Sequence, residues 1–199
     1  MTATQDAELA RNAALPEAPV APAHAVYDGV LFEAIALDAC TSAQRQRIID
    51  RTLVQSALFG VVGFGDHIPA YRCSADSTLP RIGRMGTFWR TRMATAMDAL
   101  LAEHLIIDLR SGTYAAMWTP QGAPRSRTVI VKVMQERGGR RIAVSHFSKA
   151  TKGQLVRALG SGVRELDTAP EVATAAASAG FHVTLLEDRG THVLEVLIP

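Results

Sequence analysis

Several features are scarce or missing in this sequence of 199 residues. It holds only two cysteines, Cys40 and Cys73, which are too far apart for a C-x-x-C motif, so a reduced compartment is expected. No apolar run approaches the length that spans a bilayer. The polar N-terminus also differs from a secretory signal. We therefore expect a cytoplasmic protein without a membrane partner.

The signature motifs of common enzyme classes are missing as well. The sequence contains no P-loop, no G-x-S-x-G and no H-E-x-x-H. The glycines Gly60, Gly63 and Gly65 do not follow the dinucleotide-binding pattern, and the six histidines are dispersed. We therefore predict no cofactor and no metal site, and spacing alone assigns no catalytic residue.

Charge is distributed unevenly along the chain. Residues 1–80 carry a net charge of −4, residues 81–157 of +10 and residues 158–199 of −4. Such a basic central block is typical of proteins that bind nucleic acid or nucleotide phosphates. Abundant arginine is the alternative explanation, because 18 of the 21 basic residues are Arg.

Hydrophobic periodicity and turn residues predict a single α+β unit with a mixed sheet and flanking helices. Its parts would be residues 1–22, a helix followed by a proline-rich connector, and a main body over residues 23–199. Helices are expected over 3–15, 27–35, 41–51, 87–104, 149–159 and 168–179. Strands are expected over 53–62, 105–109, 181–186 and 192–198, with a long loop over 63–84. The clearest hairpin spans 127–147 and turns at Gly138-Gly139.

The first candidate site is the start of the helix over 149–159. Ser148 would cap this helix, which would place Lys149 and Lys152 on one face in its first turn. Together with free backbone N–H groups, two lysines there would form an anion site. Gly153 would leave space beside it, and His146 could join from the preceding strand. The alternative is a solvated helix start with ordinary surface lysines.

The second candidate is the loop segment from Asp66 to Arg72. Asp66, His67, Tyr71 and Arg72 place an acid, an imidazole, a phenol and a guanidinium close together. This mixture suits phosphate recognition or proton transfer. A loop pinned by tyrosine stacking and an Arg–Asp pair would explain it equally well.

The third candidate is the segment from Asp108 to Tyr114 at the end of the strand over 105–109, where Arg110, Ser111, Thr113 and Tyr114 cluster. Binding residues often gather at strand ends, although strand termination alone would also explain the Ser-Gly-Thr segment.

Six motifs, taken in order, resemble those of the YaaA family of peroxide-stress proteins, in an actinobacterial-type form. Tyr27-Asp28-Gly29-Val30 resembles the family's "G-x-V-Y" region, and Ser56 to Val62 resembles "LSGLYGLL". The others are Asp66-x-Ile68-Pro69-Ala70-Tyr71-Arg72, Phe88-Trp89, Ile107-Asp108-Leu109-Arg110-Ser111-x-x-Tyr114 and Phe147-Ser148-Lys149-Ala150-Thr151-Lys152-Gly153.

The sequence also departs from the family pattern. The family's first strand, which ends in "SPAKT", and the following residues are expected to be missing, which would leave a strand position empty in the sheet. Gly63-Phe64 replaces Arg-Pro, Arg110 replaces alanine, and Thr113 replaces an acid.

The resemblance implies cytosolic protection against hydrogen peroxide, and binding of double-stranded or distorted DNA in a basic cleft with a helix-hairpin-helix element. Most of that element is expected in the missing segment, with its second helix retained as residues 3–15.

Two functions are therefore open. A DNA-binding stress protein would contact phosphates through Arg72, Arg110, Lys149, Lys152 and Arg157. An enzyme acting on a small phosphorylated or nucleotide-like ligand would instead need a closed polar pocket. Its candidates are Asp66, Tyr71, Ser111, Tyr114, His146 and Gly153. The oligomeric state stays open.

Overall fold

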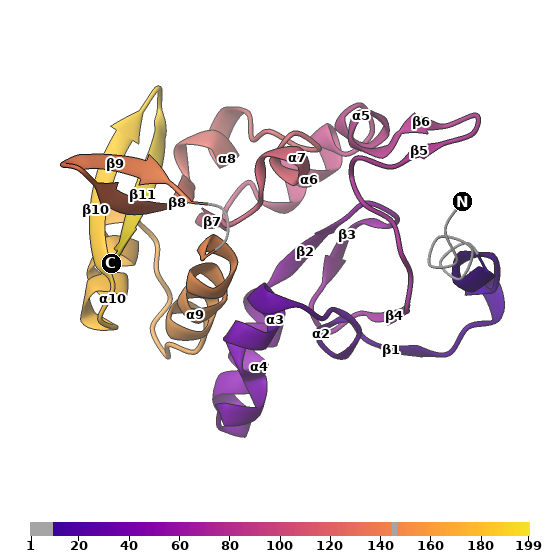
Figure 1. The fold of residues 1–199 in the computed structure, drawn as a ribbon, viewed down its shortest axis with the longest axis horizontal. Helices are drawn as coiled ribbons and strands as arrows, with labels where there is room; N and C mark the ends of the chain where they lie inside the picture. Colours follow the sequence, from indigo (N-terminus) through magenta and orange to yellow (C-terminus); the bar gives the residue numbers. More distant parts are fainter. Residues whose placement is uncertain (1–9, 145–146) are drawn as a thin grey trace.

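The structure is a computed structural model, and it describes residues 10–144 and 147–199. A mixed five-stranded sheet lies at one end of the described structure, with helices packed against it, which confirms the predicted α+β class (Figure 1). The strand order is β10-β11-β8-β7, and β9 pairs with the C-terminal part of β8. The strands are β7 (Ile106–Asp108), β8 (Thr128–Arg137), β9 (Arg140–Ala143), β10 (His182–Asp188) and β11 (Thr191–Ile198).

Strand β8 organises the sheet because it pairs with three other strands. It runs parallel to β7 and β11 and antiparallel to β9. The expected hairpin forms as β8–β9, and β10 and β11 form a second antiparallel pair. Gly138 and Gly139 have φ angles of 57° and 72°, which L-residues with side chains rarely adopt, so both turn glycines are required.

Helices α9 (Ser148–Gly160) and α10 (Ala169–Ser178) cover one face of this sheet. Val129 and Val131 lie on the same face of β8, and they pack with Leu155 of α9 and Val172 of α10 in the main core. Thr168 caps α10 in a capping box with Glu171, at the start of the helix expected over 168–179.

On the other side of α9 lie α3 (Val30–Ile35) and α4 (Ser42–Arg51). Thr41 and Gln44 form a capping box that starts α4, where a helix was expected over 41–51. Gly153 lies against α3, where a Cβ atom would collide with the carbonyl oxygen of Leu31 and lie 2.8 Å from Ala34 Cβ. The two helices therefore approach each other closely because residue 153 has no side chain.

Residues 53–62 were expected to form one buried strand, and this prediction is wrong. They form a hairpin of β2 (Leu53–Ser56) and β3 (Gly60–Gly63). Gly60 allows the reversal because it has a φ angle of 85°, and the Trp89 ring fills the space beside its Cα. An uninterrupted apolar pattern does not show where a strand reverses.

The region predicted as a long loop over 63–84 contains three short strands. Strand β4 (His67–Pro69) pairs with β1 (Val20–Pro22), and β5 (Thr78–Leu79) pairs with β6 (Gly83–Arg84). Residues 10–13 are helical, and Asn12 exchanges two hydrogen bonds with the backbone of Arg72. The connector is ordered as a 3-10 turn (Leu15–Glu17) followed by β1.

The single helix predicted over 87–104 is also wrong. The segment divides into α5 (Met85–Arg90) and α6 (Ala94–Leu100). The helix breaks shortly after Phe88. The carbonyl oxygen of Phe88 accepts hydrogen bonds from the Thr91 hydroxyl and from the Arg92 guanidinium. Side-chain groups that bond to helix carbonyls compete with the next turn.

The remaining helical elements are short and connect these parts. They are α2 (Ala23–Val26), a 3-10 turn (Leu37–Ala39), α7 (Gly112–Ala115) and α8 (Gly122–Ser126). In the described ranges, 10–144 and 147–199, no helix has both the length and the apolar character needed to cross a membrane.

Candidate functional site

A chain of hydroxyl groups joins three segments that are distant in the sequence. Ser56 ends β2 and is buried, with 1% of its surface exposed. Its Oγ accepts hydrogen bonds from the N–H groups of Leu58 (3.2 Å) and Phe59 (2.9 Å) and lies 2.6 Å from Tyr71 Oη. Tyr71 Oη lies 2.9 Å from Tyr27 Oη. The N-terminal segment, the β2–β3 hairpin and the segment after β4 are therefore linked by one polar chain.

The direction of this chain follows from the number of lone pairs. A serine hydroxyl has two lone pairs and one proton, and both lone pairs of Ser56 accept backbone N–H groups. Ser56 must therefore donate its proton to Tyr71, and Tyr71 donates to Tyr27. Phe59 packs edge-on against Tyr71, with ring centroids 5.2 Å apart, and shields the chain on one side.

All three tyrosines of the protein belong to this region, and burial raises the pKa of each. The increase is largest for Tyr71, where the bond from Ser56 only partly opposes desolvation. Tyr71 also raises the pKa of the neighbouring Tyr114. Burial raises the pKa of the Cys73 thiol too. At neutral pH these groups stay protonated, so Cys73 is not an activated thiolate.

We expect no phenol of the folded protein to titrate at the ordinary pKa of 10.0. The folded pKa values lie above the unfolded ones, so the tyrosine contribution to stability is complete below pH 10 and is lost as the pH rises further. Ultraviolet absorbance of phenolate during an alkaline titration, compared between the folded protein and the chain in urea, measures this shift. Coincident titration curves would contradict the hydrogen-bonded chain. The Tyr71→Phe variant should reduce the difference between the curves.

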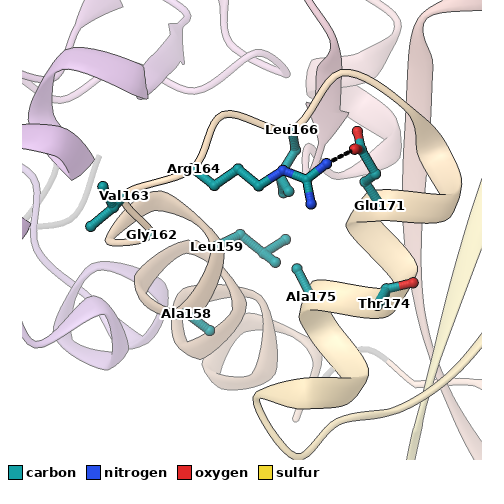
Figure 2. A pocket seen from close by; sticks show the side chains of 9 residues that line it. All are labelled: Ala158, Leu159, Gly162, Val163, Arg164, Leu166, Glu171, Thr174 and Ala175. Carbon is teal, nitrogen blue, oxygen red and sulfur yellow. Dashed lines mark hydrogen bonds and ion pairs between the residues drawn. The ribbon is translucent and has the colours of Figure 1, made fainter.

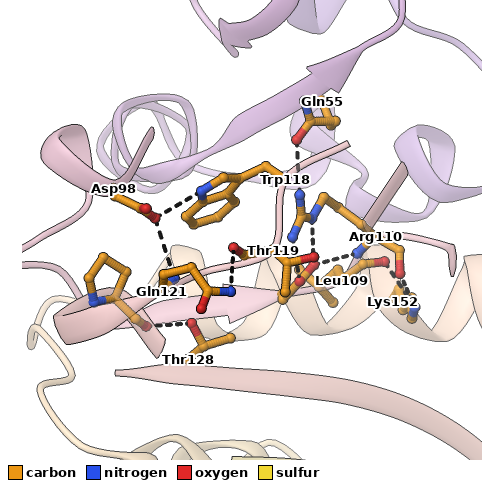
Figure 3. Close-up of polar contacts among 11 residues, drawn as sticks. Gln55, Asp98, Leu109, Arg110, Trp118, Thr119, Gln121, Thr128 and Lys152 are labelled. Carbon is orange, nitrogen blue, oxygen red and sulfur yellow. Dashed lines mark hydrogen bonds and ion pairs between the residues drawn. The ribbon is translucent and has the colours of Figure 1, made fainter. Parts of the chain in front are cut away.

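A second polar network lies where β7 ends (Figure 3). Arg110 makes a bidentate pair with Asp108, through Nε–Oδ1 (2.9 Å) and Nη2–Oδ2 (2.8 Å), and donates to Gln55 Oε1 (3.0 Å). The Arg110 guanidinium also lies over the Trp118 ring, 5.1 Å from its centroid. The Arg110 side chain is 16% exposed and that of Asp108 is 9% exposed. The pair therefore ties β2 to β7 inside the protein.

Lys152 belongs to the same network. Its Nζ donates to the carbonyl oxygen of Leu109 at 2.9 Å and lies 3.5 Å from that of Arg110 (Figure 3). Burial lowers the pKa of Lys152, while Asp108 partly opposes this. The helix begins at Ser148 with Phe147 as the N-cap residue, so the predicted Ser148 cap is wrong and Lys152 lies beyond the first turn.

The other predicted phosphate contacts, Arg72, Lys149 and Arg157, are exposed. The structure therefore divides the five predicted cations into three at the surface and two that hold β7, β2 and α9 together.

The predicted pocket residues have different surroundings. Asp66 accepts from the N–H of Gly63 (2.7 Å) and closes the β3–β4 turn, and Ser111 is the exposed N-cap residue of α7. Gly153 is a contact with α3. Tyr71 lies close enough to Tyr114 to raise its pKa. His146 lies outside the described residues.

A hollow of about 330 Å³ lies between the end of α9 and α10 (Figure 2). It has an apolar floor of Leu159, Leu166 and Ala175, and the Arg164–Glu171 ion pair spans its rim. None of the predicted site residues lines it. Among residues 10–144 and 147–199, no group of three His, Cys, Asp or Glu side chains could hold a metal ion.

Sequence reasoning missed four members of the two networks, which are Tyr27, Ser56, Gln55 and Trp118. Tyr27 and Ser56 stand inside the motifs quoted for the family resemblance, so those motifs could have indicated them. Gln55, which donates to Gly60 O (2.7 Å) and accepts from Arg110, carried no signal. A single glutamine in an apolar segment becomes informative only when its contacts are known.

The fold and these networks define an α+β protein with an internal hydroxyl chain beside a buried Asp–Arg pair. The chain belongs to the peroxide stress protein YaaA family, whose sequence profile matches residues 2–184. It is 42% identical over 152 residues to a UPF0246 protein of Streptomyces coelicolor, and that match covers 76% of this chain and 58% of the relative.

Two corynebacterial UPF0246 proteins extend the comparison. The protein of Corynebacterium efficiens is 44% identical over 187 residues, covering 92% of this chain and 72% of the relative. For Corynebacterium glutamicum the identity is 38% over 179 residues, covering 88% and 69%. The chain thus spans between about three fifths and three quarters of these relatives, and family membership rests on most of its own length.

Proposed function

We propose that this chain acts in the response to peroxide stress by binding DNA and thereby limiting oxidative damage to it. The observation that supports DNA binding is the exposure of the basic block over residues 81–157. Every basic residue of this block is exposed except Arg110, Arg125 and Lys152. Exposed cations with few acids among them attract a polyanion and release its counterions.

Lys149 and Arg157 are our preferred phosphate contacts on α9, with Arg72 as a third contact on another segment. Their exposed side chains can reach a backbone phosphate without breaking an internal bond that holds the fold. Arg110 and Lys152 are left out of this set because their charged groups already bind Asp108, Gln55 and the end of β7. A phosphate at either residue would have to displace those partners.

Duplex binding by the purified chain should weaken steeply as salt increases, with a slope of log affinity against log salt of about −0.9 per phosphate contact. The Lys149→Ala/Arg157→Ala variant should bind several-fold more weakly to all duplex sequences and show a slope smaller by about 2. Fluorescence anisotropy across a salt series measures both quantities, and a bubble duplex tests the preference for distorted DNA.

Arg45→Ala is the matched control, because Arg45 belongs to the acidic N-terminal segment and pairs with Asp38. Its affinity and slope should equal those of the wild type. Salt-independent binding, an unchanged slope in the double variant, or no binding by a cooperatively folding chain would each refute the proposal.

A further inference from the structure

A small basic hollow of about 170 Å³ lies where α5, α7 and β6 meet, apart from the networks described above. It is lined by Ala75, Arg84, Gly86, Thr87, Arg90, Thr113 and Ala116. Two guanidinium groups and two hydroxyl groups thus line one concave surface. The hollow contains none of the cations that the sequence analysis named.

Helical spacing explains why these side chains meet. Thr87 and Arg90 are three residues apart on α5, and Thr113 and Ala116 are three apart at α7, so each pair lies on one face of its helix. Among the residues that the structure describes, the side chains of Thr87, Arg90 and Thr113 make no hydrogen bond or ion pair with another residue. Their donors are available to a ligand.

The Arg84 side chain, unlike that of Arg90, already has an ion-pair partner. It pairs with Asp76, and both side chains are more than half exposed. A guanidinium group has five N–H donors in a planar fork, and one carboxylate oxygen uses few of them. Asp76 therefore holds Arg84 at the rim of the hollow and leaves donors for a second acceptor.

The surrounding segment makes this hollow electrically positive. Residues 76–98 contain Arg81, Arg84, Arg90 and Arg92 against two acids, Asp76 and Asp98, so their net charge is +2. The site thus combines a positive field with donors that come from several directions. An apolar ligand would leave these donors unsatisfied, and a cation would be repelled.

We infer that this hollow binds one phosphoryl group, either as inorganic phosphate or as part of a phosphate ester. Two guanidinium groups and two hydroxyl groups offer charge-assisted and neutral hydrogen bonds to an oxyanion with several acceptor oxygens. The inference goes beyond DNA binding, because it names a discrete site and residues outside the proposed α9 contacts.

Titration of the full chain with inorganic phosphate in chloride buffer, followed by ³¹P NMR or calorimetry, tests the site. Arg90→Gln should weaken phosphate binding about tenfold, since it removes a charged donor, and Arg90→Lys should bind with intermediate affinity. Thr113→Val should weaken it about two- to fivefold. Arg140→Gln on β9, an exposed arginine far along the chain, should leave it unchanged. Absence of phosphate binding by the wild type, or equal binding by Arg90→Gln, would overturn the inference.

A second comparison identifies the source of the phosphoryl group. If Arg90→Gln weakens adenosine monophosphate and inorganic phosphate but not duplex DNA, the site serves small phosphate esters. If it weakens duplex binding to the same degree, the phosphoryl group is a DNA phosphate. If the wild-type chain binds inorganic phosphate but no duplex DNA, the DNA proposal is refuted and the phosphate site stands.

Discussion

Replacement of Gly153 by alanine is expected to destabilise the protein by about 2 kcal/mol, although alanine is the better helix former. The new Cβ atom would meet the backbone carbonyl oxygen of Leu31 and would lie 2.8 Å from Ala34 Cβ. A backbone carbonyl within α3 cannot rotate away as the end of a flexible side chain can. Helix α3 would have to move away from α9, and the gain of about 1 kcal/mol in helix propensity would not offset that loss.

Chemical denaturation of both proteins measures this change in the free energy of unfolding. Gly112→Ala is the control, because Gly112 is also helical and a Cβ atom there would meet nothing within 4 Å. That variant should be neutral or slightly more stable. Equal stability of Gly153→Ala and the wild type would show that the two helices do not approach as closely as described.

The sheet and the helices α4 and α10 could be predicted well from the sequence because their signals are local. Residues 129–133 alternate between buried and more exposed positions, and two glycines mark the β8–β9 turn. The capping boxes at Thr41 and Thr168 start α4 and α10. Each of these features depends on neighbours within a few residues, so a pattern along the chain is sufficient to find it.

The functional residues were harder to predict because their roles depend on distant partners. Gly153 was interpreted as space beside an anion site, but the partner that requires it is α3, more than a hundred residues earlier in the chain. Sequence reasoning assigns Arg110 and Lys152 to phosphate contacts, although their contacts in the structure are Asp108 and backbone carbonyls. Net charge along a sequence does not distinguish an exposed cation from a buried one.

Arg110→Met is the variant that distinguishes a cation in an internal ion pair from a cation that contacts DNA phosphate. It should lower the free energy of unfolding by about 3–5 kcal/mol, because the Asp108 carboxylate, which is 9% exposed, would lose its charged partner. The same substitution at Arg45 should cost about 1 kcal/mol or less. Arg45 also pairs with an aspartate at 2.9 Å, but its side chain is 40% exposed and the Asp38 carboxylate is fully exposed.

The double variant Asp108→Asn/Arg110→Met provides the sharper measurement. The backbone N–H of residue 110 donates to Asp108 Oδ1 at 3.0 Å. Asparagine at position 108 keeps an oxygen that can accept this hydrogen bond, but it carries no unpaired charge. The double variant should therefore regain at least half of the stability that Arg110→Met loses, as denaturant titration would show. If instead Arg110→Met unfolds like the wild type and loses duplex affinity, Arg110 acts as a phosphate contact and its pairing with Asp108 is dispensable. A large loss of stability that the second substitution restores would make Arg110 the internal tie between β2 and β7, and would leave DNA contact to the exposed cations of α9.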